Sequence, residues 1–201
     1  KFQNPSPTSR ELRDVDFVDE QTGWVVGPGT VLKSVNGGKT WKFQINGYKQ
    51  NHRLFSVDFV DAQTGWVVGD SGTILKTTNG GNSWNKQNSG TYYGFNSVRF
   101  IDSQTGWVTG YSNGNGFGDF GVKTMLKTSN GGQSWDSIPG LFGKSVYFIN
   151  ASLGWASGAN GEIRKTTDGG QTWQSQNSGT TNMIWDIYFF DSLHGWAQGI
   201  A

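Results

Sequence analysis

A Gly-Trp pair that recurs about every 41 residues constrains the fold of this chain more than any other feature. The five copies are Gly23-Trp24, Gly65-Trp66, Gly106-Trp107, Gly154-Trp155 and Gly195-Trp196, so the steps are 42, 41, 48 and 41 residues. A fixed period of this length indicates an array of supersecondary units that bury their apolar faces against one another. The chain is therefore predicted to be a repeat array.

A second motif recurs out of phase with the first, and its centre reads Asn-Gly-Gly or Asp-Gly-Gly. Its four copies span residues 34–41, 77–84, 128–135 and 166–173, and each ends in Trp. Asn, Asp and Gly suit a tight chain reversal because they tolerate positive φ or bond the local backbone. Each repeat thus reads as four short strands, which in one repeat begin near residues 56, 66, 74 and 84.

Four antiparallel strands in 40 to 45 residues describe one blade of a β-propeller. We therefore predict an all-β propeller of four-stranded antiparallel blades, with four complete blades and a partial fifth. It forms a single region over residues 1–201 of this 201-residue chain. The predicted repeat units cover about 14–46, 56–88, 97–138, 145–177 and, in part, 186–201.

Composition excludes several classes of function. Sixteen Lys and Arg stand against 15 Asp and Glu, without a basic run, so nucleic acid is not expected as a partner. The chain has no apolar stretch long enough to span a membrane. It has no Cys and 2 His, so neither a metal site nor a cofactor is predicted.

The repeat itself accounts for most aromatic and acidic residues. Nine of the 10 Trp occupy repeat positions, and we expect them to pack between blades. Trp185 lies outside the repeat motifs but aligns with Phe55, which also predicts core packing. Recurrent acids at the end of the first strand are predicted to cap turns; they are Asp19, Asp61, Asp102 and Asp191.

The second motif resembles the Asp-box, or bacterial neuraminidase repeat, with Asn in three of its four copies. Together with the Phe-Val-Asp-x-x-Thr-Gly-Trp-Val-Val-Gly pattern, it is most similar to the photosystem II stability/assembly factor family. That resemblance implies a non-catalytic propeller, usually of about seven blades. Similar repeats in secreted bacterial proteins imply an extracytoplasmic location: secreted, cell-surface or periplasmic. Similar repeats in sialidases and xyloglucan-degrading glycosidases leave a carbohydrate function open.

The two ends of the chain predict an incomplete blade. Residues 1–3 resemble the fourth strand at residues 41–44, whereas the C-terminal residues stop after a second strand. A blade built from both ends would lack its third strand and leave unpaired edges, which native sheets avoid. We expect either a longer propeller or another segment that supplies the strand, and self-association through the open edge is an alternative.

Residues that depart from the repeat are the candidates for binding, because the fold does not require them. One loop after a second strand is expanded, at residues 111–123, and the loops between blades are irregular. We predict a binding face rich in aromatic side chains, which are typical of protein interfaces and of sugar-stacking sites. The predicted residues are Tyr48, His52, Arg53, Tyr92, Tyr93, Phe95, Arg99, Tyr111, Phe117, Asp119 and Phe120.

No catalytic set emerges from the sequence. Gly110–Gly114 fits a hydrolase elbow and Gly116–Gly121 fits a dinucleotide motif, but neither has the helix that such motifs need. Glycosidases need two carboxyls in a set geometry, and nothing in this chain singles out a pair. We predict a non-catalytic binding, assembly or scaffold propeller that recognises a protein partner. The alternatives are a glycan-binding or glycosidase-associated propeller and a surface-layer or filament subunit.

Overall fold

The computed structural model describes residues 11–46, 52–113, 120–138 and 143–199. All secondary structure in these residues is β-strand except one short 3-10 helix at Ala159–Gly161. The chain divides into two compact units, Lys1–Tyr92 and Tyr93–Ala201. None of the described elements is a helix with the length and apolarity needed to cross a membrane.

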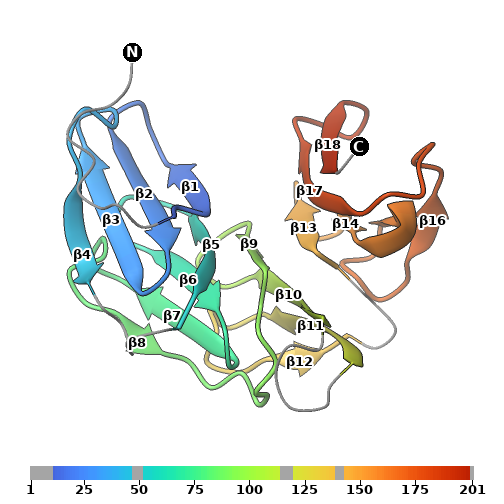
Figure 1. Ribbon diagram of the computed structural model, residues 1–201, viewed down its shortest axis with the longest axis horizontal. Helices are drawn as coiled ribbons and strands as arrows, with labels where there is room; N and C mark the ends of the chain where they lie inside the picture. Colours follow the sequence, from blue (N-terminus) through green and yellow to red (C-terminus); the bar gives the residue numbers. More distant parts are fainter. Residues whose placement is uncertain (1–10, 47–51, 114–119, 139–142, 200–201) are drawn as a thin grey trace. The chain divides into compact units, whose positions relative to one another are not determined.

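The first unit contains two four-stranded antiparallel sheets, in which strand order follows the chain (Figure 1). One sheet consists of β1 (Asp14–Phe17), β2 (Thr22–Gly27), β3 (Thr30–Val35) and β4 (Lys42–Asn46). The other consists of β5 (Leu54–Phe59), β6 (Gly65–Gly69), β7 (Thr73–Thr77) and β8 (Asn85–Lys86).

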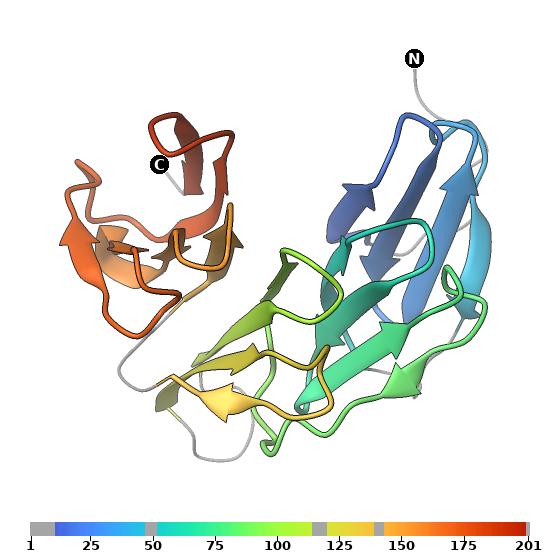
Figure 2. The ribbon, with the colours of Figure 1, turned by 180° about the vertical axis from the view of Figure 1, so that it is seen from behind.

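The second unit contains two further four-stranded sheets and one sheet of two strands (Figure 2). The third sheet consists of β9 (Ser97–Phe100), β10 (Gly106–Asn113), β11 (Phe120–Thr128) and β12 (Asp136–Ser137). The fourth consists of β13 (Ser145–Phe148), β14 (Gly154–Ser157), β15 (Ile163–Thr166) and β16 (Gln174–Gln176). The last consists of β17 (Ile184–Phe189) and β18 (Gly195–Gly199). The predicted four complete blades and partial fifth are confirmed.

A carboxylate or amide oxygen caps the turn between the first and second strand of each sheet. Asp61 Oδ1 accepts hydrogen bonds from the backbone N–H groups of Gln63 and Thr64, both at 2.7 Å. Asn150 does the same in the fourth sheet at 2.9 and 2.8 Å. The predicted role of the other recurrent acids, Asp19, Asp102 and Asp191, is confirmed by the same pair of bonds.

The Asn-Gly-Gly turn between the third and fourth strand is held by side chains within it. Asn79 Oδ1 accepts from the Ser83 backbone N–H at 2.9 Å, and the Thr77 hydroxyl accepts from the Gly81 N–H at 2.9 Å. Gly80 and Gly81 have φ of 67° and 92°, a region that L side chains rarely adopt. The turn is therefore a structural element, as its resemblance to the Asp-box implies.

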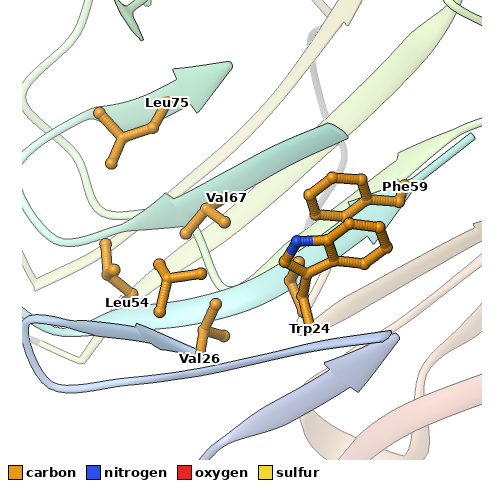
Figure 3. Packing of buried hydrophobic residues seen from close by; sticks show 8 residues of the cluster. Trp24, Val26, Leu54, Phe59, Val67 and Leu75 are labelled. Atoms are coloured by element: carbon orange, nitrogen blue, oxygen red, sulfur yellow. The ribbon is translucent and has the colours of Figure 1, made fainter. Parts of the chain in front are cut away.

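Within each unit, neighbouring sheets pack through a Trp of one sheet and a Phe of the next, as Figure 3 shows for the first unit. Trp24 of β2 stacks on Phe59 of β5, with ring centroids 3.5 Å apart and planes 6° from parallel. Around this stack, Leu54, Val67 and Leu75 complete a buried apolar cluster. The same stack recurs in the second unit between Trp107 and Phe148 and between Trp155 and Phe189, at 3.6 Å in each case.

Two tryptophans depart from the predicted core. Trp196 of β18 is 64% exposed, although it occupies the same repeat position as the buried Trp155. Trp185 is 43% exposed, so the prediction that it packs in the core is wrong. Its indole instead faces the Lys144 ammonium, 4.7 Å from the ring centroid. Both residues lie in the two-stranded sheet, where strands that would cover them are not among the described residues.

Candidate functional site

The loops between sheets lie against the turns that follow each second strand. In the first unit, the backbone N–H of Gly29 donates to His52 O at 2.9 Å, and the Ser89 hydroxyl donates to Gly72 O at 3.0 Å. In the second unit, Ile184 N–H donates to Gly158 O at 3.0 Å. The two kinds of loop therefore open on one edge of each unit, which is the arrangement predicted for a binding face.

Arg53 is fixed at this edge of the first unit. Its guanidinium Nε lies 3.5 Å from Asp70 Oδ2, and its backbone N–H donates to the same oxygen at 3.2 Å. Its side chain remains 59% exposed, so it is accessible to a ligand. The backbone of the neighbouring His52 accepts the bond from Gly29, and the His52 side chain is half-buried.

Tyr92 is the most exposed aromatic residue that the sequence singled out. It is 93% exposed, whereas Tyr93 is half-buried. Phe95 is completely buried, so its predicted place on a binding face is a correction: its ring is part of the apolar interior. The sequence alone did not separate these three residues because all lie in one irregular loop.

The expanded loop is described only at its two ends. Tyr111 lies in β10 opposite Lys123, and Phe120 begins β11 opposite Asn113, with an irregular register between the two pairs. Tyr48, Phe117 and Asp119 lie outside the described residues. The hypothesis that these five residues bind a partner stays a prediction.

A row of contacting side chains crosses the first strands of the second unit. The Arg99 guanidinium lies over the Tyr147 ring, 4.5 Å from its centroid, and its Nε donates to Phe148 O at 3.3 Å. Tyr147 meets Tyr188 edge to face at 5.0 Å, and Tyr188 in turn lies 6.2 Å from the Trp196 ring. We call Arg99, Tyr147, Tyr188 and Trp196 the aromatic row.

Sequence reasoning included only Arg99 of this row among the binding residues. For the two tyrosines a signal was present, because Tyr147 and Tyr188 occupy the position before the first-strand Phe, which varies between repeats. For Trp196 there was none, since it is a repeat Trp that was expected to pack between blades. In the first unit that position holds Asp16 and Asp58. Asp16 Oδ2 accepts the Phe59 backbone N–H at 2.6 Å, and Asp58 is 5% exposed. The first unit therefore holds acidic side chains at this position, one hydrogen-bonded to the neighbouring strand and one buried, whereas the second unit holds an Arg and two Tyr there, of which Tyr188 is exposed.

A pocket of about 340 Å³ lies beside the two-stranded sheet in the second unit. Its walls are apolar and weakly polar, and they come from β15, β17, β18 and the loop that precedes β17. The lining residues are Ile163, Ser178, Thr180, Asn182, Met183, Ile184, Ala197 and Gly199. No acidic or basic side chain lines this pocket, so it fits an apolar group rather than a charged one.

Hydrogen bonds lower the pKa values of three turn carboxylates. The hydroxyl of Thr172 donates to Asp168 at 2.5 Å, and with the Thr172 backbone N–H it lowers the Asp168 pKa to about 2. Backbone hydrogen bonds from Gln21 and Thr22 lower the pKa of Asp19. A hydrogen bond from His194 lowers the pKa of Asp191. A glycosidase acid needs a raised pKa, so these three groups do not suit that role.

In the described part of the chain, no three His, Asp or Glu side chains lie close enough together to hold a metal ion. The aromatic row presents exposed Tyr188 and Trp196 side chains, and Arg99 contacts the Tyr147 ring beside them. These residue types dominate the energetics of protein interfaces. The arrangement therefore suits recognition.

A family model described as "Photosynthesis system II assembly factor YCF48" matches residues 3–91 and 44–141. No curated protein matches the chain in sequence. A solved structure of YCF48 bound to a D1 peptide is 17% identical, with a TM-score of 0.56, over 96% of this chain and 91% of that chain.

Two other kinds of solved structure share the architecture. An ancestral GH74 enzyme is 24% identical, with a TM-score of 0.66, over 86% of this chain and 24% of that chain. The WD40 β-propeller domain of Doa1 is 16% identical, with a TM-score of 0.66, over 96% of this chain and 62% of that chain. At these identities the likeness shows the fold alone, and the predicted β-propeller architecture is confirmed.

Proposed function

Because the chain belongs to the photosynthesis system II assembly factor YCF48 family, we propose that it is a non-catalytic module that binds a protein partner. The observation that carries this proposal is the aromatic row of the second unit. Arg, Tyr and Trp are the residue types most often found as interface hot spots. Here they contact one another, so their side chains are ordered before a partner arrives and lose less entropy on binding.

The exposure of the row increases along its length. Arg99 and Tyr147 are half-buried, Tyr188 is 50% exposed and Trp196 is 64% exposed. Arg99 is held by Tyr147 and by the Phe148 carbonyl, which keeps its charge at a fixed place beside the rings. A peptide laid along this row would meet a cation at one end and apolar ring faces at the other.

The mode of recognition we propose is capture of an extended peptide of the partner. A member of the family, YCF48, has been solved bound to a D1 peptide. The exposed loop residues of the first unit, Arg53 and Tyr92, are candidates for a second contact area. We place the protein outside the cytoplasm, as a secreted, cell-surface or periplasmic protein.

The test is binding of a synthetic D1 peptide, and of a library of unrelated peptides, to the 201-residue chain. Calorimetry should give saturable binding for at least one peptide. Tyr147→Ala and Tyr188→Ala should each weaken it by about 30-fold or more, since a hot-spot truncation costs about 2 kcal/mol or more. Phe190→Ala is the matched control, because Phe190 is 73% exposed and lies outside the row.

Two results would contradict the proposal. The first is that no peptide of the library binds. The second is that the Phe190→Ala change reduces affinity as much as the changes in the row do. Circular dichroism of each variant separates loss of binding from loss of fold.

A carbohydrate function is the second candidate, and the exposure of Tyr92 favours it. A Tyr ring that is 93% exposed can stack on a sugar as well as on a peptide. An oligosaccharide array should then show saturable binding that disappears in Tyr92→Ala and Tyr93→Ala. Hydrolysis of xyloglucan oligosaccharides by the purified chain would show that it is a glycoside hydrolase and would contradict the non-catalytic proposal.

A further inference from the structure

The turns between third and fourth strands contain a chemically labile dipeptide. In three of the four, Asn is followed directly by Gly, the sequence in which Asn is most prone to deamidation; the pairs are Asn36-Gly37, Asn79-Gly80 and Asn130-Gly131. In that reaction the backbone nitrogen of the Gly attacks the side-chain carbonyl carbon of the Asn, and Gly permits the approach because it has no Cβ. The fourth turn contains Asp168 in place of the Asn.

In the folded chain the attacking nitrogen is already hydrogen-bonded. Gly80 N–H donates to Gln63 O, in the turn between β5 and β6, at 2.8 Å. The Gly80 carbonyl accepts from Trp24 Nε1 at 3.2 Å and from Lys33 Nζ at 3.0 Å, both in the neighbouring sheet of the first unit. The residue is also buried. Its nitrogen can therefore reach the side-chain carbon of Asn79 only after these bonds open.

The Asn side chain is held by its own turn. Asn79 Oδ1 accepts from the Thr77 hydroxyl at 3.0 Å and from the Ser83 backbone N–H at 2.9 Å, and Asn79 Nδ2 donates to the Ser83 hydroxyl at 2.8 Å. Rotation of the amide toward the Gly80 nitrogen would break these bonds. Asn79 is nevertheless exposed, so water reaches it, and the protection comes from geometry rather than from burial.

The same bonds occur in the second unit. Asn130 Oδ1 accepts from the Ser134 backbone N–H at 3.0 Å, and Asn130 Nδ2 donates to the Ser134 hydroxyl at 2.8 Å. Gly131 N–H donates to Gln104 O at 2.8 Å. The turn at residues 34–41 has equivalent bonds. The arrangement is therefore a property of the Asn-Gly-Gly turn rather than of one sheet.

The fourth sheet shows that this turn accepts Asp in place of Asn. Asp168 Oδ1 accepts from the Thr166 hydroxyl at 2.8 Å and from the Thr172 backbone N–H at 2.9 Å, and the Thr172 hydroxyl donates to the carboxylate instead of accepting. An Asp formed from Asn79 can therefore hold its turn in the same way. An isoaspartate cannot, because its main chain runs through the side-chain carbon and is one methylene longer, which displaces Gly80.

We propose that Asn36, Asn79 and Asn130 are deamidation sites that react only when the turn that holds each of them opens. In the opened turn the Gly nitrogen bonds to the Asn side-chain carbon, the bond from that carbon to Nδ2 breaks, and ammonia leaves with the proton of the Gly nitrogen. Water then hydrolyses the cyclic imide at one of its two carbonyl carbons and gives Asp or isoaspartate. The product carries an additional negative charge at neutral pH, and the isoaspartate form cannot restore the turn.

The experiment incubates the 201-residue chain at neutral pH and measures conversion at each Asn by mass spectrometry of its proteolytic fragments. A synthetic peptide of residues 75–85 gives the rate at Asn79 without a fold. The folded chain should convert Asn79 at least about 10-fold more slowly than the peptide, since only the small population of opened turns reacts. In increasing urea, the rate should rise with the unfolded fraction and approach that of the peptide.

Thr77→Val opens one turn selectively. It removes the hydroxyl that donates to Asn79 Oδ1 and accepts the Gly81 N–H, with little change in side-chain shape. The rate at Asn79 should rise by about 10-fold, as expected from the net loss of about one hydrogen bond. The rate at Asn130, in the other unit, should stay unchanged and is the control within the same molecule.

Equal rates at Asn79 in the folded chain and in the peptide would overturn the proposal, and so would a rate that does not follow the unfolded fraction in urea. An equal rise at Asn79 and Asn130 in a Thr77→Val chain that circular dichroism shows to be folded would also overturn it, because the turn would then not control the reaction. If Thr77→Val does not fold, the urea series of the unchanged chain decides the question.

Discussion

Strands β14 and β18 begin with the same three residues and differ in almost everything else. Gly154-Trp155-Ala156 and Gly195-Trp196-Ala197 lie 41 residues apart in the same unit. Trp155 is 3% exposed and stacks on Phe189 at 3.6 Å, whereas Trp196 is 64% exposed. The contrast shows that the Gly-Trp-Ala sequence does not by itself determine whether its Trp side chain is buried. Burial comes from a third strand on one side and from the first-strand Phe of the next sheet.

The largest expected difference between the two strands is in the free energy of unfolding when each Trp is replaced by Ala. Trp155→Ala empties a packed site between β14 and β17 and should lower the free energy of unfolding by about 3–5 kcal/mol. Trp196→Ala removes a mostly exposed ring and should change it by about 0.5 kcal/mol. Urea denaturation of both variants measures this, and equal losses would break the comparison.

Replacing the glycine before each of these tryptophans should also cost more stability in β14 than in β18. A Cβ at Gly154 would lie 2.5 Å from the ring of Phe148, which is completely buried and stacked on Trp107. Gly154→Ala should therefore cost about 1–3 kcal/mol, as overpacking does. Gly195→Ala meets Phe189 at 2.5 Å, and this ring stacks on Trp155 but is half-exposed, so a shift toward solvent disturbs fewer buried neighbours. Thermal midpoints should therefore fall less for Gly195→Ala, and the reverse order would be inconsistent with the structure.

The Lys over Trp155 offers a smaller and more local test. Lys165 Nζ lies 5.1 Å from the ring centroid, a contact worth about 0.5–1 kcal/mol at an accessible site. A double-mutant cycle of Lys165→Ala and Trp155→Leu should recover a coupling energy of this size. A coupling energy indistinguishable from zero would contradict a stabilising contact between Lys165 and Trp155.

The turn between β15 and β16 provides the smallest effect, which depends on pH. Hydrogen bonds lower the Asp168 pKa from 3.8 to about 2, so its contribution to stability is present above about pH 4 and is lost as the pH falls toward 2. Asp168→Asn should remove that dependence, because Asn79 already holds the equivalent turn. Thermal midpoints of both proteins from pH 2 to 6 should converge at the acid end, and a constant difference would contradict this account.

The repeat predicted the sheets because each blade is specified locally, by an Asp-capped turn, an Asn-Gly-Gly turn and alternating apolar residues. Exposure is a different property, since it depends on neighbours that are distant in sequence. Trp185 and Phe95 show the consequence: the first aligned with a core position and is exposed, and the second lay in an irregular loop and is buried. Tyr147 and Tyr188 were visible only as variable positions, and their contact at 5.0 Å required the packing of β13 against β17.

Amide hydrogen exchange at Ala156 and Ala197 tests the central claim most directly, namely that identical motifs differ because the outer edge of β14 pairs with β15, whereas no strand among the described residues pairs with the outer edge of β18. Ala156 pairs with Arg164 of β15, and its amide should exchange slowly. The Ala197 amide should exchange far faster in this chain, because no described strand accepts its N–H. Equal protection of the two amides would contradict the claim.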